Sequence, residues 1–149
     1  MALDRSFVEL NRVSSARMHS LATRLSNEEL MRRAGKGWTV AVTFAHIAFW
    51  DLRVMSILEA TERDGKLCAP EIDISVNDIL PVLLGAIPPR LAANIAFQTA
   101  EALDDMLERF PVDLLEQIYA RSQRWVARAL HRNHHMDAIE AALQSSEQK

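Results

Sequence analysis

The chain has 149 residues, 49% of them hydrophobic and 25% charged, and its 20 acidic and 17 basic side chains give a net charge of −3. This length predicts a single domain with its own hydrophobic core. Charges of both signs are interspersed, which excludes the basic surface expected of a nucleic-acid binder. The first residues do not resemble a signal peptide, and no apolar run has the length of a membrane span. We therefore expect a cytoplasmic protein without nucleic-acid or membrane partners.

Cys68 is the only cysteine of the chain. This excludes an intrachain disulfide and fits a reducing compartment. No histidine lies near Cys68 in the sequence, so we interpret it as an ordinary loop residue and assign it no role.

Four long segments show the three-to-four residue spacing of apolar side chains that predicts helices. The first covers about residues 3–25 and is followed by a short extra turn over 27–33. The second starts after Thr39, a residue type that caps helix N-termini, and stops at Gly65, a residue type that ends helices.

Residues 66–89 form a long connection that we expect to contain a short helix over 76–85. The third helix follows, because proline is tolerated in a first helical turn, and Pro111 ends it. A short turn over 112–120 leads to the fourth helix, expected from about residue 122 to residue 144.

No segment alternates with the two-residue period of a half-buried strand, and no internal repeat is visible. The sequence therefore predicts an all-α protein. We expect an antiparallel four-helix bundle over residues 1–145, with one long connection between its second and third helices, followed by a polar tail at 146–149.

Three of the five histidines lie within HRNHHMDAIE, residues 131–140. His131 and His135 are four positions apart, so on a helix they lie on the same face and can direct ring nitrogens at one point. His134 falls on the flank of that face. His19 is interpreted as a surface residue.

His46, in the second predicted helix, projects from the most apolar face of that helix and needs a partner if it is buried there. Alone, His46 is an ordinary hydrogen-bonded core residue, and the His131–His135 spacing is a weak signal. Together the three supply neutral nitrogen ligands for one cation from two helices. Three protein ligands leave coordination positions open, as in reactive sites. Zinc is the first expectation and nickel the second.

Two motifs resemble the DinB-like family of metalloenzymes, which is related to the metal-binding domain of mycothiol-dependent maleylpyruvate isomerase. The first motif is GWTVAVTFAHIAFWDLRV at 37–54, and the second is HRNHHMDAIE at 131–140. The matching residues of the first are Trp38, Thr39, His46, Trp50 and Asp51. Those of the second are His131, His135, Met136 and Ile139. The chain departs from the family pattern at Val42, where a Glu or Gln often completes the helix cap.

The resemblance implies a four-helix bundle with a divalent metal bound by His46, His131 and His135. It favours a small metal-dependent enzyme, a thiol-dependent transferase or isomerase acting on small electrophiles. In that hypothesis a low-molecular-weight thiol is a partner, Trp50 forms a pocket wall, and Arg53 receives an anionic group. Packing and surface roles for Trp50 and Arg53 are the ordinary alternatives.

A second hypothesis is a non-catalytic binding or stress-response module in which the metal only ties two helices together. Asp104, Asp105 and Glu108 lie in a segment interpreted as a solvated helix face, and no acid–base group stands out near the histidines. A third hypothesis is that the histidines are hydrogen-bonded core residues without a metal. Family members often pair, so a homodimer is also expected.

Overall fold

A computed structural model describes residues 2–147 as seven α-helices and two short 3-10 helices, with no strand among these residues. The long helices are α1 (Ser6–Arg24), α3 (Val40–Asp64), α5 (Pro89–Arg109) and α7 (Ala129–Glu147). The short ones are α2 (Asn27–Leu30), α4 (Val76–Leu84), α6 (Val112–Arg121), η1 (Gly35–Gly37) and η2 (Gln123–Trp125). The all-α prediction is confirmed, but the helix count is higher than the four that were predicted.

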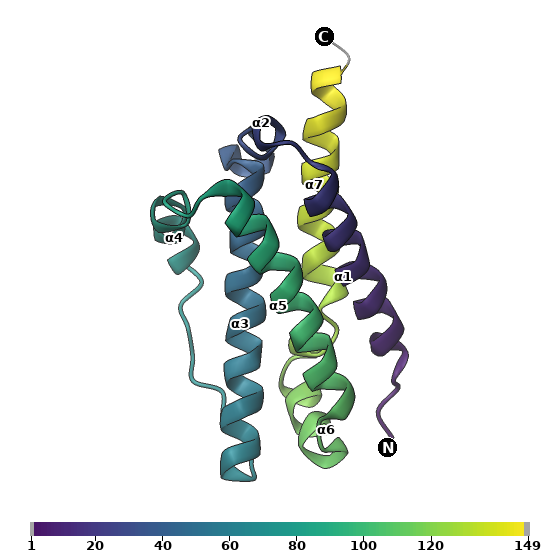
Figure 1. Ribbon diagram of the computed structural model, residues 1–149. Coiled ribbons are helices and arrows are strands. Elements are labelled where there is room, and N and C mark those ends of the chain that lie inside the picture. Colours follow the sequence, from purple (N-terminus) through teal and green to yellow (C-terminus); the bar gives the residue numbers. More distant parts are fainter. Residues whose placement is uncertain (1, 148–149) are drawn as a thin grey trace.

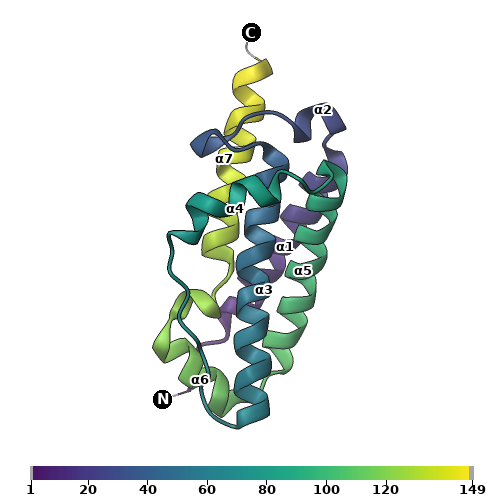
Figure 2. The same ribbon diagram turned by 90° about the vertical axis from the view of Figure 1, so that its left-hand side faces the viewer.

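The four long helices lie side by side, with α5 packed on both α3 and α1, and α7 packed on both α1 and α3. Helices α1 and α7 run in one direction, and α3 and α5 run in the other (Figures 1 and 2). The predicted antiparallel order therefore does not hold for the neighbours α3 and α5. The reason is the long connection over residues 66–88, which returns along α3 to its starting end and carries α4 there.

Helix α3 begins and ends as the sequence predicts. The Thr39 hydroxyl accepts a hydrogen bond from the Val42 backbone N–H at 3.1 Å. At the other end Gly65 has a φ of 69°, a left-handed conformation that glycine adopts without steric cost. Helices α2 and α4 also form where short helical segments were expected.

The end of the chain differs from the prediction. Residues 112–121 form a complete helix rather than a short turn, and α7 starts at Ala129 rather than near residue 122. The start is fixed by a distant residue: the Asn11 side chain accepts a hydrogen bond from the Ala129 N–H at 3.0 Å and donates one to the Val126 carbonyl at 2.8 Å. Of the predicted tail at 146–149, residues 146–147 belong to α7 and 148–149 lie outside the described residues.

Helix α3 is long and apolar enough to cross a membrane by length and composition, contrary to the expectation that no segment is. However, 67% of its most apolar window is buried against the other helices. This burial is typical of a core helix.

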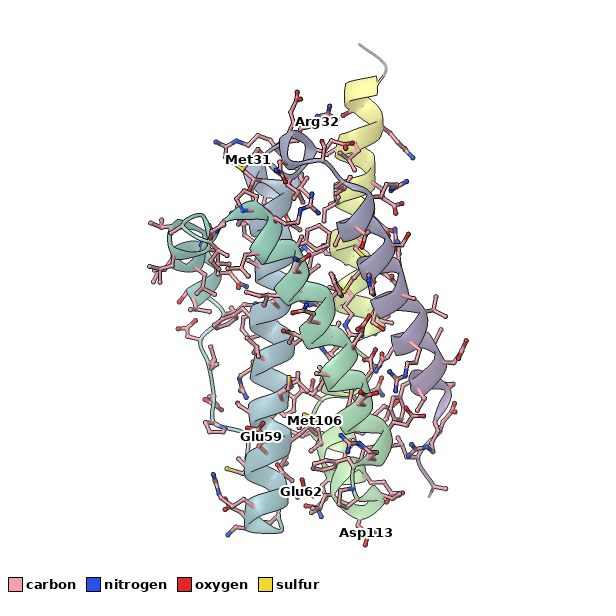
Figure 3. The ribbon with its side chains drawn as sticks, in the orientation of Figure 1. Met31, Arg32, Glu59, Glu62, Met106 and Asp113 are labelled. Atoms are coloured by element: carbon pink, nitrogen blue, oxygen red, sulfur yellow. The ribbon has the colours of Figure 1, made fainter. Side chains whose placement is uncertain are left out.

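The core consists of two apolar clusters that succeed one another along the long helices. One gathers residues such as Met18, Phe44 and Met136, and the other residues such as Phe7, Leu107 and Ile118. Figure 3 places Met31 and Arg32 at the end of the molecule near the first cluster, and Asp113 at the opposite end.

A buried polar network lies between the two clusters. Arg132 of α7 is fully buried and donates to Asp51 Oδ2 of α3 at 3.0 Å and to Asp104 Oδ1 of α5 at 2.9 Å. Arg128 donates to the other oxygen of Asp51 at 2.8 Å. Arg132 also donates to the Ser14 hydroxyl of α1 at 3.1 Å. One cation thus contacts three other long helices.

The interpretation of Asp104 as part of a solvated face is wrong. Asp104 is 4% exposed, and burial raises the pKa of its carboxyl group against the opposing effect of Arg132. Its neighbours Asp105 and Glu108 are exposed as expected and pair with Arg12 at 2.7 and 2.5 Å. The helical pattern of the sequence does not show which of these carboxylates is buried. Their burial depends on which residues of α7 lie opposite them.

We expect Arg132→Met to destabilise the fold by about 3–5 kcal/mol, the typical cost of leaving buried charges without their partner. Urea denaturation at pH 7 would measure the loss. As a control, Arg109→Met removes an exposed cation from α5 and should change stability by about 0.5 kcal/mol or less. An Arg132→Met variant as stable as the parent would show that Asp51 and Asp104 do not require this cation.

Candidate metal centre

The structure brings together the three histidines that the sequence singled out. His46 comes from α3, and His131 and His135 come from successive turns of α7. One nitrogen of each imidazole lies within 4.8 Å of the other two. His46 and His135 are 4% and 8% exposed, and His131 is half-buried. Within residues 2–145, whose side chains the structure describes, no other trio of His, Cys, Asp or Glu has this proximity.

The distance between two of these nitrogens matches that expected around a small divalent cation. Two histidine nitrogens at zinc–nitrogen distances of 2.0–2.1 Å and a tetrahedral angle are about 3.3 Å apart. The Nε2 atoms of His46 and His131 are 3.3 Å apart. Imidazole nitrogens are ligands for zinc, nickel and other transition metals. His46, His131 and His135 would therefore hold such an ion, with its remaining positions left for small molecules.

Trp38 covers one side of the cluster. Its ring centroid lies 4.9 Å from that of His46 and 6.4 Å from that of His135. The preceding residues Lys36 and Gly37 have φ values of 63° and 80°, and this left-handed turn leads the chain back over the histidines. Trp38 belongs to the first family-like motif, but its contact with the histidines could not be predicted from the motif.

All three imidazoles are held in the neutral form. Burial lowers the pKa of His46 to about 4 and that of His135 to about 3. Burial also lowers the pKa of His131, and the nearby Arg128 guanidinium acts in the same direction. Neutral imidazole is the form that binds metals, so at pH 7 no proton has to be displaced from a charged ring.

Arg128 constrains the tautomer of His131. Its Nη2 group lies 3.2 Å from His131 Nδ1 and has only N–H groups to offer, so Nδ1 is the acceptor and the ring proton is on Nε2. That proton faces His46 Nε2. A metal ligated by His131 Nε2 requires the proton at Nδ1 instead, where it would oppose the Arg128 N–H. Metal binding in this manner therefore requires this N–H to turn away from Nδ1.

The other two histidines take no part in the cluster. His134 is exposed, as its position on the flank of the helix face predicted, although its ring centroid is 5.1 Å from that of His135. His19 is an exposed residue of α1, stacked on Phe97 and 2.8 Å from a carboxylate oxygen of Glu101. The interpretation of His19 as a surface residue is confirmed.

A pocket of about 350 Å³ opens beside the histidines, within the size range of small-molecule sites. Trp50 and Arg53 both line it, as do all three clustered histidines. The Trp50 indole N–H donates to Asn77 of α4 at 3.0 Å. The Arg53 guanidinium donates to the Pro70 carbonyl and stacks on Trp125, with its carbon 5.6 Å from the ring centroid. Both predicted residues therefore reach the same space as the histidines.

The pocket has three further basic residues that were not predicted from the sequence: Lys36, Arg124 and Arg128. Arg128 could have been found, since it precedes His131 by three positions and shares its face on the predicted helix. In the structure Arg128 is the residue before α7. Lys36 and Arg124 lie in η1 and η2, which have no apolar periodicity to place them.

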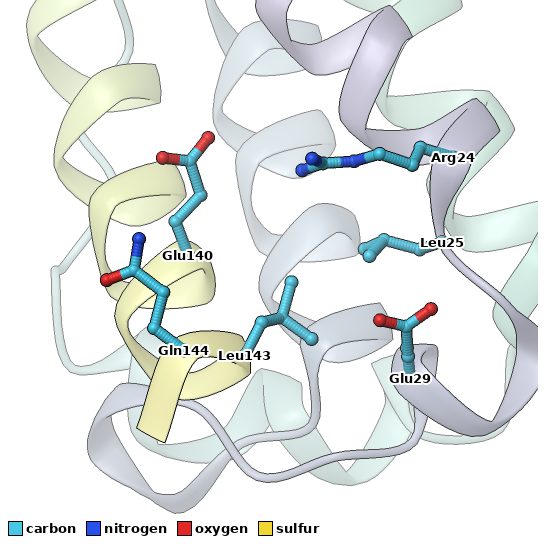
Figure 4. Close-up of a pocket in the computed structure, with 6 residues that line it drawn as sticks. All are labelled: Arg24, Leu25, Glu29, Glu140, Leu143 and Gln144. Carbon is cyan, nitrogen blue, oxygen red and sulfur yellow. The ribbon is translucent and has the colours of Figure 1, made fainter. Parts of the chain in front are cut away.

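A second hollow of about 340 Å³ lies between α1, α2 and α7 (Figure 4). Its lining residues are Arg24, Leu25, Glu29, Glu140, Leu143 and Gln144. Neither a histidine nor a cysteine lines it. The hollow therefore offers no site comparable to the histidine pocket.

Comparison with protein family models, curated proteins and solved structures gives no match to this chain. The resemblance to the DinB-like family therefore rests on the two motifs, and the case for a metal centre rests on the geometry of the three histidines.

We expect the stability of the metal-free protein to fall between pH 7 and pH 5. In the unfolded chain the histidines bind protons near pH 6.5, whereas folded His46 stays neutral down to about pH 4. Between these values the unfolded state binds more protons, so the free energy of unfolding falls as the pH falls. Urea denaturation across this range, with a chelator present, would measure the loss.

The control is a variant with His46, His131 and His135 all replaced by Gln, which cannot bind these protons. Its stability should depend less on pH over the same range than that of the parent. Identical pH dependence in both proteins would show that the three histidines are not held neutral by the fold.

Proposed function

We propose that this chain is a small metal-dependent enzyme of the DinB-like kind, built as a four-helix bundle with added short helices. Its divalent metal, zinc first and nickel second, would be held by His46, His131 and His135. The observation that carries the proposal is the convergence of three neutral imidazole nitrogens within 4.8 Å at the edge of a pocket. We further propose that it acts in the cytoplasm as a homodimer.

An open metal site favours catalysis over a purely structural role. Structural zinc sites normally have four protein ligands, whereas sites with three keep a position for water or substrate. Here no cysteine or carboxylate joins the three histidines among the described residues. The pocket beside them gives a small molecule access to the position that the protein leaves open.

We propose thiol-dependent transfer or isomerisation on a small electrophile as the reaction class. When bound, the metal would keep a low-molecular-weight thiol in its reactive thiolate form at neutral pH. The protein residues would orient the reactants: Trp38 shields the cluster on one side, Trp50 forms a wall, and Arg53 offers N–H donors to an anionic group. The motifs support this class through the resemblance, and the pocket lining is compatible with it.

We expect untagged purified protein to contain about one transition-metal ion per chain, as a three-histidine site predicts. Elemental mass spectrometry would measure it. His46→Ala should lose the metal, since only His46 contributes a ligand from α3, whereas the matched control His134→Ala should keep it. Protein that stays metal-free after incubation with zinc and with nickel would contradict the metal centre.

We expect the cobalt-substituted protein to develop a sulfur-to-cobalt charge-transfer band with glutathione, mycothiol or bacillithiol, and metal-dependent turnover when an electrophile is added. The change in absorption reports thiolate binding directly, independently of turnover. His131→Ala should abolish both signals. If the metal-loaded protein binds none of these thiols and turns over no electrophile, thiol-dependent catalysis is refuted.

A non-catalytic, metal-stabilised module is the second candidate. The observation that favours it is that the ligands come from two helices, so a metal would tie α3 to α7. In that case chelation would lower the melting temperature while no thiol or other small molecule binds the loaded protein.

A further inference from the structure

The pocket beside the histidines is lined by basic residues and by no carboxylate. Arg128 is neutralised by buried Asp51 at 2.8 Å. The other three, Lys36, Arg53 and Arg124, form no ion pair with any described residue. The chain as a whole carries a net charge of −3, so the pocket has the opposite sign to the molecule. Such a cleft concentrates anions.

Arg53 has an N–H group that lacks a partner. Its Nε atom is buried and makes no hydrogen bond, while its Nη2 donates to the Pro70 carbonyl and its guanidinium stacks on Trp125. The two contacts fix the orientation of the side chain. Glu71 and Asp73 line a neighbouring hollow that Arg53 also borders, but neither forms an ion pair with it. The buried Nε faces no open space, but the Nη1 group is neither buried nor hydrogen-bonded to a described residue, so an oxygen of an anionic ligand can bind Nη1.

The pocket residues of α3 also set the length of a ligand. His46, Trp50 and Arg53 follow one another at intervals of four and three residues, so they lie on one face of the helix. At 1.5 Å per residue, His46 and Arg53 are about 10 Å apart along the helix axis. Trp50, held by Asn77, lies between them. Trp125 of η2 lines the same pocket.

We propose that this pocket selects an elongated organic anion. Its carboxylate or phosphate binds Arg53, its apolar or aromatic body lies against Trp50 and Trp125, and its other end reaches the three histidines. The inference deepens the proposed function and rests on it for the reactive end of the ligand. The anion subsite itself requires no metal, because the groups that form it are provided by Arg53 and the two tryptophans.

The test compares an acid with its neutral counterpart on metal-free protein. The probes are 3-phenylpropionate, 3-phenylpropionamide and phenethyl phosphate, and their binding is measured by calorimetry and by tryptophan fluorescence. We expect both anions to bind at least about tenfold more tightly than the amide, as a charge-assisted hydrogen bond predicts. The anion that binds with the higher affinity shows whether the subsite prefers a carboxylate or a phosphate.

Three variants assign the preference to Arg53. Arg53→Gln should reduce the ratio of acid affinity to amide affinity to about one. Arg53→Lys keeps the positive charge but not the planar guanidinium, and should retain part of the preference for the acid. The matched control is Arg121→Gln, because Arg121 also stacks on Trp125 but does not line this pocket. It should keep the parental ratio. Circular dichroism melting confirms that each variant is folded.

Equal affinity of the parent for acid and amide, or no binding of either anion at millimolar concentration, would overturn the proposal. So would an acid preference that persists in Arg53→Gln. Metal content is measured separately on the same preparations. An anion preference in a protein that never binds metal would therefore uphold the subsite while refuting the metal-dependent function.

Discussion

The buried guanidinium of Arg132 is the group on which the arrangement of the long helices depends. It lies between two carboxylates from α3 and α5 and also contacts a hydroxyl of α1. A buried cation is tolerated only when its donors are satisfied, so each of these helices must be placed where its acceptor reaches the guanidinium. The donors of the network are directional, so they restrict the position of α7 relative to α3.

That position is what creates the candidate metal centre. Arg128, just before α7, and Arg132 of α7 both bind Asp51, and His131 and His135 follow Arg128 and Arg132, respectively, by three residues. On α3, Asp51 follows His46 by five residues. The ion pairs of Asp51 with Arg128 and Arg132 therefore place His46 opposite His131 before any metal binds. Arg128 connects the buried charged network to the histidine cluster, because it contacts both Asp51 and the His131 ring.

Helical content and the three-histidine trio could be predicted because both follow from local periodicity. Apolar spacing defines a helix face, and positions four apart share it, so His131, His135 and the apolar setting of His46 were visible in the sequence. What could not be predicted depends on contacts between distant segments. The start of α7 is fixed by Asn11, the burial of Asp104 by Arg132, and the parallel neighbours α3 and α5 by the path of a connection without a strong pattern. The basic residues of η1 and η2 were missed because these short helices have no apolar periodicity to place them.

The two sides of the candidate metal centre are 85 residues apart in the chain, since His46 lies in α3 and His131 in α7. Closing so large a loop costs conformational entropy before any contact within the centre is gained. The three imidazoles therefore meet only after α7 has docked, through its cap from Asn11 and its buried arginines. During synthesis α1, α3 and α5 leave the ribosome before α7, so the three histidines cannot converge until α7 has been made and has docked. If the histidines bind a metal ion, its uptake would distinguish molecules in which α7 has docked from those in which it has not.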